Sequence, residues 1–217
     1  MHKLALISQK GGSGKSTLSI HLATEAARSG KRALLIDLDP QGNAVRWAGR
    51  RGDNLPPDVS AESPAALEGV IEDAEREGYD LLVFDTAPNA DRTALRAAKA
   101  ADLVFIPCRP SQFDIEAIGA TLDLCEMARR QAVVVLNAAP IRSRVVEEAR
   151  EAIAGRKATV CPVVIRERVA LRHCMPDGMV AAEFDPASVA AKEIAALYKH
   201  MTACLNVDNS AKWHEKV

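Results

Sequence analysis

The chain has 217 residues, of which 48% are hydrophobic, and its formal net charge is -1. This length and this hydrophobic content suffice for one substantial core, and one α/β domain accounts for them most simply. Because the charges nearly balance, binding to a polyanion would have to come from a local basic patch rather than from the field of the whole molecule. The five cysteines include no CxxC pair, so they support neither a disulfide framework nor a zinc site.

The first predicted elements are a buried strand over residues 3–8, a glycine-rich turn and an amphipathic helix over residues 16–29. Glycines let successive backbone N–H groups point inward at phosphate oxygens, and the helix N-terminus adds partial positive charge. In a turn of this kind the lysine reaches the β- and γ-phosphates and the following hydroxyl binds Mg²⁺. The turn reads QKGGSGKST, and its candidate phosphate-binding residues are Gly11, Gly12, Ser13, Gly14, Lys15, Ser16 and Thr17.

A second apolar strand is predicted over residues 32–37, and it ends in the sequence DLDPQGNA. Asp37 and Asp39 therefore fall where a parallel strand delivers its residues to a ligand crevice. The alternative is that both are turn-forming aspartates that cap Pro40. Residues 53–77 then carry eight acidic residues against one arginine, with a helix predicted from about Ala65. Such a run is a solvated face or, alternatively, a docking surface for a basic partner segment.

A third buried strand, DLLVFD over residues 80–85, ends in Asp85 and is similar to a Walker B strand, in which the aspartate holds Mg²⁺ through water. Further along the chain we predict a helix over residues 92–101, a strand over 102–106, the loop PCRPSQFD over 107–114, a helix to about 130 and a strand over 132–136. Asn137 stands at the end of the last of these strands.

The remaining predicted elements are a helix over residues 144–154, short strand-like pieces over 158–165 and a closing helix over 186–205. Strands that alternate with helices favour a doubly wound, mainly parallel α/β sheet flanked by helices. We expect one domain over residues 1–205, followed by a polar tail over 206–217. The segment IRERVALRH contributes a basic cluster formed by Arg166, Arg168 and Arg172.

Three motifs, KGGSGKST, DLDPQGNA and DLLVFDTAP, make the chain similar to the ParA/MinD family of deviant Walker A ATPases, and its length and layout resemble small ParF-like ParA partition proteins. The resemblance implies a P-loop NTPase fold, with ATP and Mg²⁺ as cofactors and hydrolysis of ATP to ADP and phosphate. It implies that Lys10 crosses the interface of a homodimer to the partner's nucleotide. It further implies that Asp39 orients the attacking water, and that Asp37 joins Ser16 and Asp85 around the metal.

The same resemblance implies that Asn137 contacts adenine, although a cap or turn asparagine is the alternative. It implies that the loop over residues 107–114 lies near the nucleotide and the dimer contact, whereas the residues alone also fit a proline-punctuated loop with a helix cap. For Arg166, Arg168 and Arg172 it implies nonspecific DNA binding in the ATP dimer, and a solvated surface is the alternative for each arginine.

On this basis the predicted function is a DNA segregation ATPase that a ParB-like or other small adaptor protein stimulates. A positioning ATPase with a protein cargo is the alternative, and a metabolic P-loop enzyme is a third reading. No run of about 18 apolar residues or basic amphipathic tail is present, so we expect neither a membrane span nor membrane targeting. Because the sequence runs directly into its first strand, we expect no signal peptide and a cytoplasmic, nucleoid-associated protein.

Overall fold

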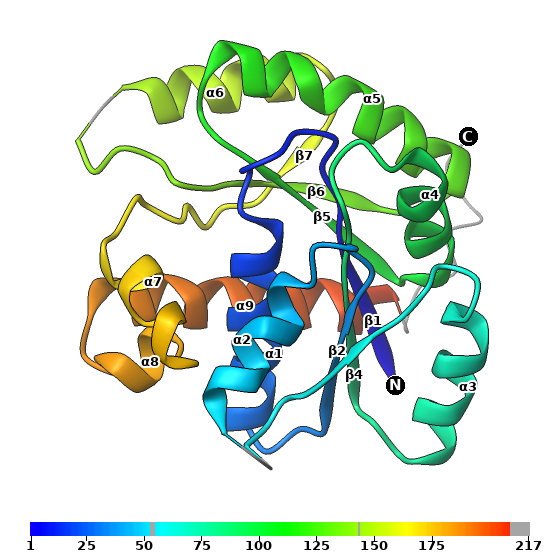
Figure 1. Cartoon of the computed structure of the whole chain (residues 1–217). Helices are drawn as coiled ribbons and strands as arrows, with labels where there is room; N and C mark the ends of the chain where they lie inside the picture. The colour runs from blue at the N-terminus through cyan, green and yellow to red at the C-terminus, as the bar shows by residue number, and fades with distance from the viewer. Residues whose placement is uncertain (53–54, 143, 209–217) are drawn as a thin grey trace.

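The structure, a computed structural model, describes residues 1–52, 55–142 and 144–208. Within these residues a seven-stranded sheet runs in the order β3-β2-β4-β1-β5-β6-β7, and every pair of neighbouring strands is parallel (Figure 1). The predicted doubly wound parallel sheet is therefore confirmed. The strands are β1 (His2–Leu6), β2 (Ala33–Asp37), β3 (Asp58–Ala61), β4 (Leu81–Asp85), β5 (Leu103–Cys108), β6 (Ala132–Leu136) and β7 (Thr159–Val160).

Helices cover both faces of the sheet, which is why the central strands are apolar along their whole length (Figure 1). Alternate residues of each strand enter two separate cores. Leu4 and Leu6 pack with the helices α1, α2 and α9, while Ala5 lies in the core formed with α3, α4, α5 and α6. The long helices are α1 (Lys15–Arg28), α2 (Asn43–Arg51), α3 (Leu67–Arg76), α4 (Asp91–Ala100), α5 (Gln112–Ala128), α6 (Val145–Ala154) and α9 (Val189–Asp208).

Several elements were not predicted from the sequence. The short helices α7 (Ala170–His173), η1 (Met175–Asp177) and α8 (Ala181–Phe184) lie before α9, and α2 begins with the last two residues of the motif DLDPQGNA. The acidic run over residues 53–77 also contributes the edge strand β3 and buries Leu67 and Ala74 of α3, so it is more than a solvated face. The closing helix continues to Asp208, and residues 209–217 of the predicted tail lie outside the described part of the chain.

The order of the strands reverses at the middle strand, β1, and this reversal marks where a ligand would bind. Strands β4 and β2 lie on one side of β1, and β5 and β6 lie on the other, so the order reverses at β1. Ligands of doubly wound sheets bind outside the carboxyl ends of the strands at this reversal. The register pairs Leu6 with Asp85 and Asp85 with Asp37, which brings the ends of β1, β4 and β2 level with one another.

Candidate functional site

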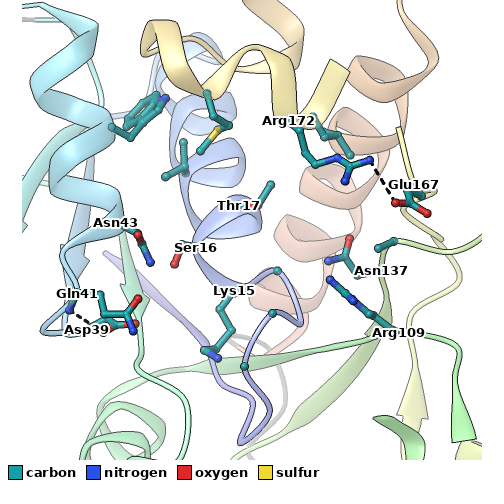
Figure 2. A pocket seen from close by; sticks show the side chains of 18 of the residues that line it. Lys15, Ser16, Thr17, Asp39, Gln41, Asn43, Arg109, Asn137, Glu167 and Arg172 are labelled. Carbon is teal, nitrogen blue, oxygen red and sulfur yellow. Dashed lines mark hydrogen bonds and ion pairs between the residues drawn. The ribbon is translucent and has the colours of Figure 1, made fainter. Parts of the chain in front are cut away.

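The glycine-rich turn between β1 and α1 forms the floor of a cleft of about 710 Å³ (Figure 2). It starts where the Ile7 N–H donates to the Phe105 carbonyl at 3.0 Å, and it ends where α1 begins at Lys15. Gly12 and Gly14 adopt φ values of +73° and +98°, which side chains with a Cβ rarely tolerate. These two glycines therefore let the backbone wrap around a site in front of the N-terminus of α1.

Asn137, the residue after β6, stabilises the turn through a hydrogen bond from its side chain. Its side-chain amide donates to the Ser13 carbonyl at 2.7 Å. A Cβ on Gly14 would lie 2.1 Å from the same amide nitrogen, so a side chain there would displace the Asn137 amide as well as strain the backbone. The side chain also lines the cleft, and in this structure it holds the turn in shape, which the sequence did not predict (Figure 2).

Lys15 is 6% exposed, and its ammonium group lies inside the curve of the turn. Its Nζ donates to the Ser8 carbonyl at 3.1 Å and to the Lys10 carbonyl at 3.3 Å. Burial lowers the pKa of Lys15, and the carboxylates of Asp85 and Asp39 partly oppose that shift. A cation held by neutral carbonyls is well placed to attract an anion into the cleft.

Asp85, at the end of β4, is fully buried beside Lys15. Burial raises its pKa to about 7, while the Ser16 hydroxyl acts in the opposite direction. Its Oδ1 accepts from the Ser19 hydroxyl at 3.4 Å, but its Oδ2 is buried without a hydrogen-bond partner. An orphaned carboxylate oxygen near a hydroxyl fits hard cations such as Mg²⁺, which prefer oxygen ligands and keep several waters.

Asp37 is the last residue of β2 and Asp39 lies two residues beyond it, and the two carboxylates make different contacts. The Asp37 carboxylate accepts from the Asp39 N–H at 3.1 Å and from the N–H groups of Ala44 and Val45 at 2.9 and 3.3 Å. Asp37 thus caps the N-terminus of α2 rather than the turn at Pro40, and it acts on Asp85 through its charge. Asp39 accepts from the Gln41 N–H at 2.9 Å and lines the cleft (Figure 2).

Lys10 points away from the cleft in this single chain. Its Nζ lies 3.0 Å from Oδ2 of Asp114, in the first turn of α5, and its side chain is 39% exposed. Ser111 caps α5 by accepting from the Asp114 N–H at 3.3 Å, and its hydroxyl also donates to the Asp114 carboxylate. The loop over residues 107–114 is therefore both a helix cap, as one alternative predicts, and the anchor of Lys10.

The predicted basic cluster lines the same cleft. Arg168 is the most restrained of the three, since its guanidinium binds Glu193 of α9 at 2.7 Å and both side chains are largely buried. Arg166 donates to the Pro140 carbonyl at 2.7 Å. Arg172 is exposed and lies 3.2 Å from the Glu167 carboxylate (Figure 2).

The cleft residues that were missed from the sequence include Arg46, Trp47, Arg50 and Arg109. The first three belong to α2, a helix that was not predicted from the sequence. The acidic cap Asp37 followed by NAVRWAGRR was an available signal for that helix. Arg109 lies within the motif PCRPSQFD, but nothing in the sequence separates it from an ordinary loop arginine.

Within the described ranges, no group of three or more His, Cys, Asp or Glu side chains could hold a metal ion by itself. In that same part of the chain, no helix is long and apolar enough to cross a membrane. The five cysteines, which all lie in the described part of the chain, form no disulfide with one another.

Comparison with known proteins identifies related sequences. The chromosome-partitioning ATPase Soj of Thermus thermophilus is 34% identical over 160 residues, which cover 59% of this chain and 63% of Soj. A maintenance of carboxysome distribution protein A from Gloeobacter kilaueensis is 39% identical over 121 residues, or 55% of this chain and 54% of the relative. The chain thus spans between half and two thirds of the length of these curated relatives.

Solved structures share the fold. The septum site-determining protein MinD of Pyrococcus horikoshii, solved with Mg-ADP, superposes with a TM-score of 0.78 at 18% identity, covering 97% of this chain and 99% of its own. The sequence family of the CobQ/CobB/MinD/ParA nucleotide-binding domain matches residues 4–181. With that match over most of its length, and with the phosphate-loop cleft described above, this chain belongs to the CobQ/CobB/MinD/ParA family of nucleotide-binding domains.

Proposed function

We propose that residues 1–205 form one ATPase domain, which binds MgATP in the cleft and hydrolyses it to ADP and phosphate. The observation that supports this most is the unpaired buried oxygen of Asp85, which lies beside Lys15 and Ser16 at the carboxyl end of the sheet. Phosphoryl transfer to water needs positioned cations and an oriented nucleophile more than covalent chemistry. The cleft offers both kinds of group.

The proposed roles follow from the positions of the side chains. The turn from Gly11 to Thr17 and Lys15 would hold the phosphates, and Ser16 with Asp85 would hold Mg²⁺, with Asp37 contributing charge. A bound Mg²⁺ would neutralise charge that develops on the phosphates. Asp39 would orient the attacking water, because its carboxylate lines the cleft on the side of Ser16 (Figure 2). Asn137 would lie toward the adenine.

We propose that Lys10 acts on the nucleotide of a second copy in a two-fold sandwich dimer. In the single chain Lys10 is bound to Asp114, so crossing the interface requires that it exchange this carboxylate for a phosphate. A cation supplied across an interface in this way is worth about 10³ to 10⁵ in rate in known NTPases. Hydrolysis should therefore depend on dimer formation.

The cellular role proposed first is segregation of DNA. Its support is the similarity to Soj, named as a chromosome-partitioning ATPase, and the arginines Arg166, Arg168 and Arg172 on one side of the cleft. The dimer would bind DNA nonspecifically over the nucleoid, and a small adaptor protein such as a ParB-like partner would stimulate hydrolysis. Similarity to a carboxysome distribution protein favours a second candidate, in which the cargo is a protein assembly.

Analytical ultracentrifugation of the wild type with ATP, ADP or no nucleotide, each with and without random-sequence DNA, tests the proposal. ATP alone should double the sedimenting mass, and DNA should co-sediment only with that dimer. Lys10→Ala should shift both effects to higher protein concentrations and lower turnover, whereas Lys31→Ala, at the opposite end of the sheet, should leave dimer formation, DNA co-sedimentation and turnover unchanged. ATP-dependent doubling with full turnover in Lys10→Ala would exclude the role of Lys10 across the interface.

A further inference from the structure

Arg109 brings a guanidinium group to the phosphate turn from a different part of the fold. It follows β5 directly, and its Nη2 is the nearest atom to the position that a Cβ on Gly12 would take, at 3.7 Å. Figure 2 shows its side chain pointing across the cleft toward the turn. The tip of Arg109 therefore lies over the part of the turn that would face the β- and γ-phosphates.

The backbone of Arg109 is held in place on both sides. The Ser111 N–H donates to its carbonyl at 2.8 Å, and the preceding residue, Cys108, accepts from the Asn137 N–H at 2.8 Å. Pro110, which follows it, is buried. Because the loop is fixed to β6 and to the cap of α5, the side chain starts from a defined position above the turn.

The guanidinium of Arg109 differs from those of the predicted basic cluster. Arg166, Arg168 and Arg172 each donate to a carbonyl or a carboxylate. Within the described ranges of the chain, Arg109 makes no such side-chain hydrogen bond or ion pair, and its side chain is exposed to the cleft. An exposed guanidinium with all its donors available suits a planar, two-point contact with phosphate oxygens.

The two lysines near the turn do not occupy the position above it that Arg109 takes. Lys15 lies within the turn, and Lys10 is bound to Asp114 outside the cleft. In the proposed dimer the partner's Lys10 would enter the site from across the interface, so Lys15 is the lysine that each chain supplies to its own triphosphate. A guanidinium from the same chain would add donors fixed relative to the turn, at the phosphates where charge develops during hydrolysis.

The geometry points to Arg109 as a second cation that the same chain supplies to the β- and γ-phosphates of its own nucleotide. This inference rests on the proposed ATPase function and adds a residue acting within one subunit to the lysine acting from the other. Arg109 would bind the triphosphate and stabilise the charge that shifts onto the leaving phosphate during hydrolysis. Arg109 would form hydrogen bonds but no covalent bond, and it would transfer no proton, since arginine stays protonated.

Arg109→Ala and Arg109→Lys test this role by calorimetric titration with MgATP and MgADP and by steady-state turnover. Loss of the guanidinium should weaken MgATP binding more than MgADP binding and should lower kcat by about 10²-fold. Arg109→Lys should recover only part of each loss, because an ammonium lacks the planar fork. Arg76→Ala, an exposed arginine on α3, is the matched control and should behave as the wild type. Unchanged affinity and turnover in Arg109→Ala would refute the inference.

Mixing two variants then separates action within a subunit from action across the interface. A dimer of one Lys10→Ala chain and one Arg109→Ala chain contains one intact site if Lys10 acts from the partner and Arg109 acts on its own nucleotide. An equal mixture should therefore regain about a quarter of the wild-type turnover, because half of the dimers are mixed and each has one intact site of two. No recovery would overturn the assignment of Arg109 to its own site. A wild type that neither dimerises nor hydrolyses ATP would instead refute the proposed function.

Discussion

Asp85 carries its charge where the surroundings of the ligand-free protein do little to stabilise it. Burial raises its pKa to about 7, so the folded chain binds a proton that the unfolded chain has lost above pH 4. Stability should therefore fall as the pH rises from about 4 to about 7, by on the order of 4 kcal/mol in total. Asp85→Asn should raise the free energy of unfolding at pH 8 and should raise it much less at pH 5, as measured by urea denaturation.

The same substitution should remove the Mg²⁺ dependence of nucleotide binding, because the cation loses a carboxylate partner. Titration with ATP in the presence of Mg²⁺ or EDTA measures that dependence. Asp123→Asn, on the exposed face of α5, provides the control and should keep wild-type stability and metal dependence. If Asp85→Asn were less stable than the wild type at pH 8, Asp85 would be a structural hydrogen-bond acceptor rather than a group kept for a cation.

His21 gives the opposite dependence on pH. Burial lowers its pKa to about 4 from 6.5, although its hydrogen bond to the Thr17 carbonyl acts in the other direction. The ring also accepts from the Ala181 N–H at 3.2 Å and so joins α1 to α8. Because the unfolded chain takes up the proton near pH 6.5, this histidine should cost about 3 kcal/mol of stability as the pH falls from 6.5 to 4.

His21→Leu should remove that part of the pH dependence, while exposed His173→Leu should leave it unchanged. The measurement is the free energy of unfolding at several pH values between 7 and 4. The difference between variant and wild type is diagnostic, because Asp85 and Asp37, whose pKa values are raised, act in the opposite direction. Parallel curves for His21→Leu and the wild type would show that His21 takes up its proton at the same pH in the folded and in the unfolded chain.

At the scale of elements, helix α2 forms one wall of the cleft and depends on a close contact with the turn after η1. A Cβ on Gly178 would lie 2.4 Å from the Arg51 nitrogen, and Gly178 has a φ of +68°. Gly178→Ala should push α2 outward, lower the free energy of unfolding by a few kcal/mol and weaken ATP binding. Thermal unfolding and calorimetric titration measure the two effects.

Gly30→Ala is the matched control for that substitution. Gly30 has a φ of +80° but no atom within 4 Å of the position that a Cβ would take. Alanine at this position would therefore strain the backbone without a steric clash. The control should lose about 1 kcal/mol and keep its affinity for ATP. Equal losses in the two variants would mean that the contact between α2 and the turn contributes nothing to the cleft.

Long apolar strands and the glycine-rich turn made most of the sheet predictable. Strands such as β4, LLVFD, are recognised from composition alone because both of their faces are covered. Helix α2 was missed since Ala44 and Trp47 are its only buried residues, and the carboxylate that caps it stands in the preceding strand. The edge strand β3 is too short to show a pattern within the acidic run. Contacts such as that of Asn137 with Ser13 join distant segments and follow only from the fold.

For the whole molecule, the affinity for DNA should fall with salt concentration to an extent set by the arginines that can reach DNA phosphates. Arg168 is paired with Glu193, so exposed Arg172 is the better candidate for a phosphate contact. Arg172→Glu should move the slope of log affinity against log salt toward zero by about 2, because a dimer loses two contacts. Arg76→Glu changes the net charge by the same amount and should leave the slope unaltered. Filter-binding assays at several salt concentrations measure the slope for each variant. Equal shifts in both variants would indicate an effect of overall charge only.

Trp47 lies on α2 at the wall of the cleft, with its indole N–H donating to the Met179 carbonyl at 3.2 Å and the Arg51 guanidinium 5.0 Å from the centre of its ring. The sequence contains only one other tryptophan, Trp213. A Trp213→Phe chain would therefore emit ultraviolet light from a single indole next to the nucleotide site. Stopped-flow recording of that emission would follow the entry and departure of unmodified ATP in real time, without any attached dye.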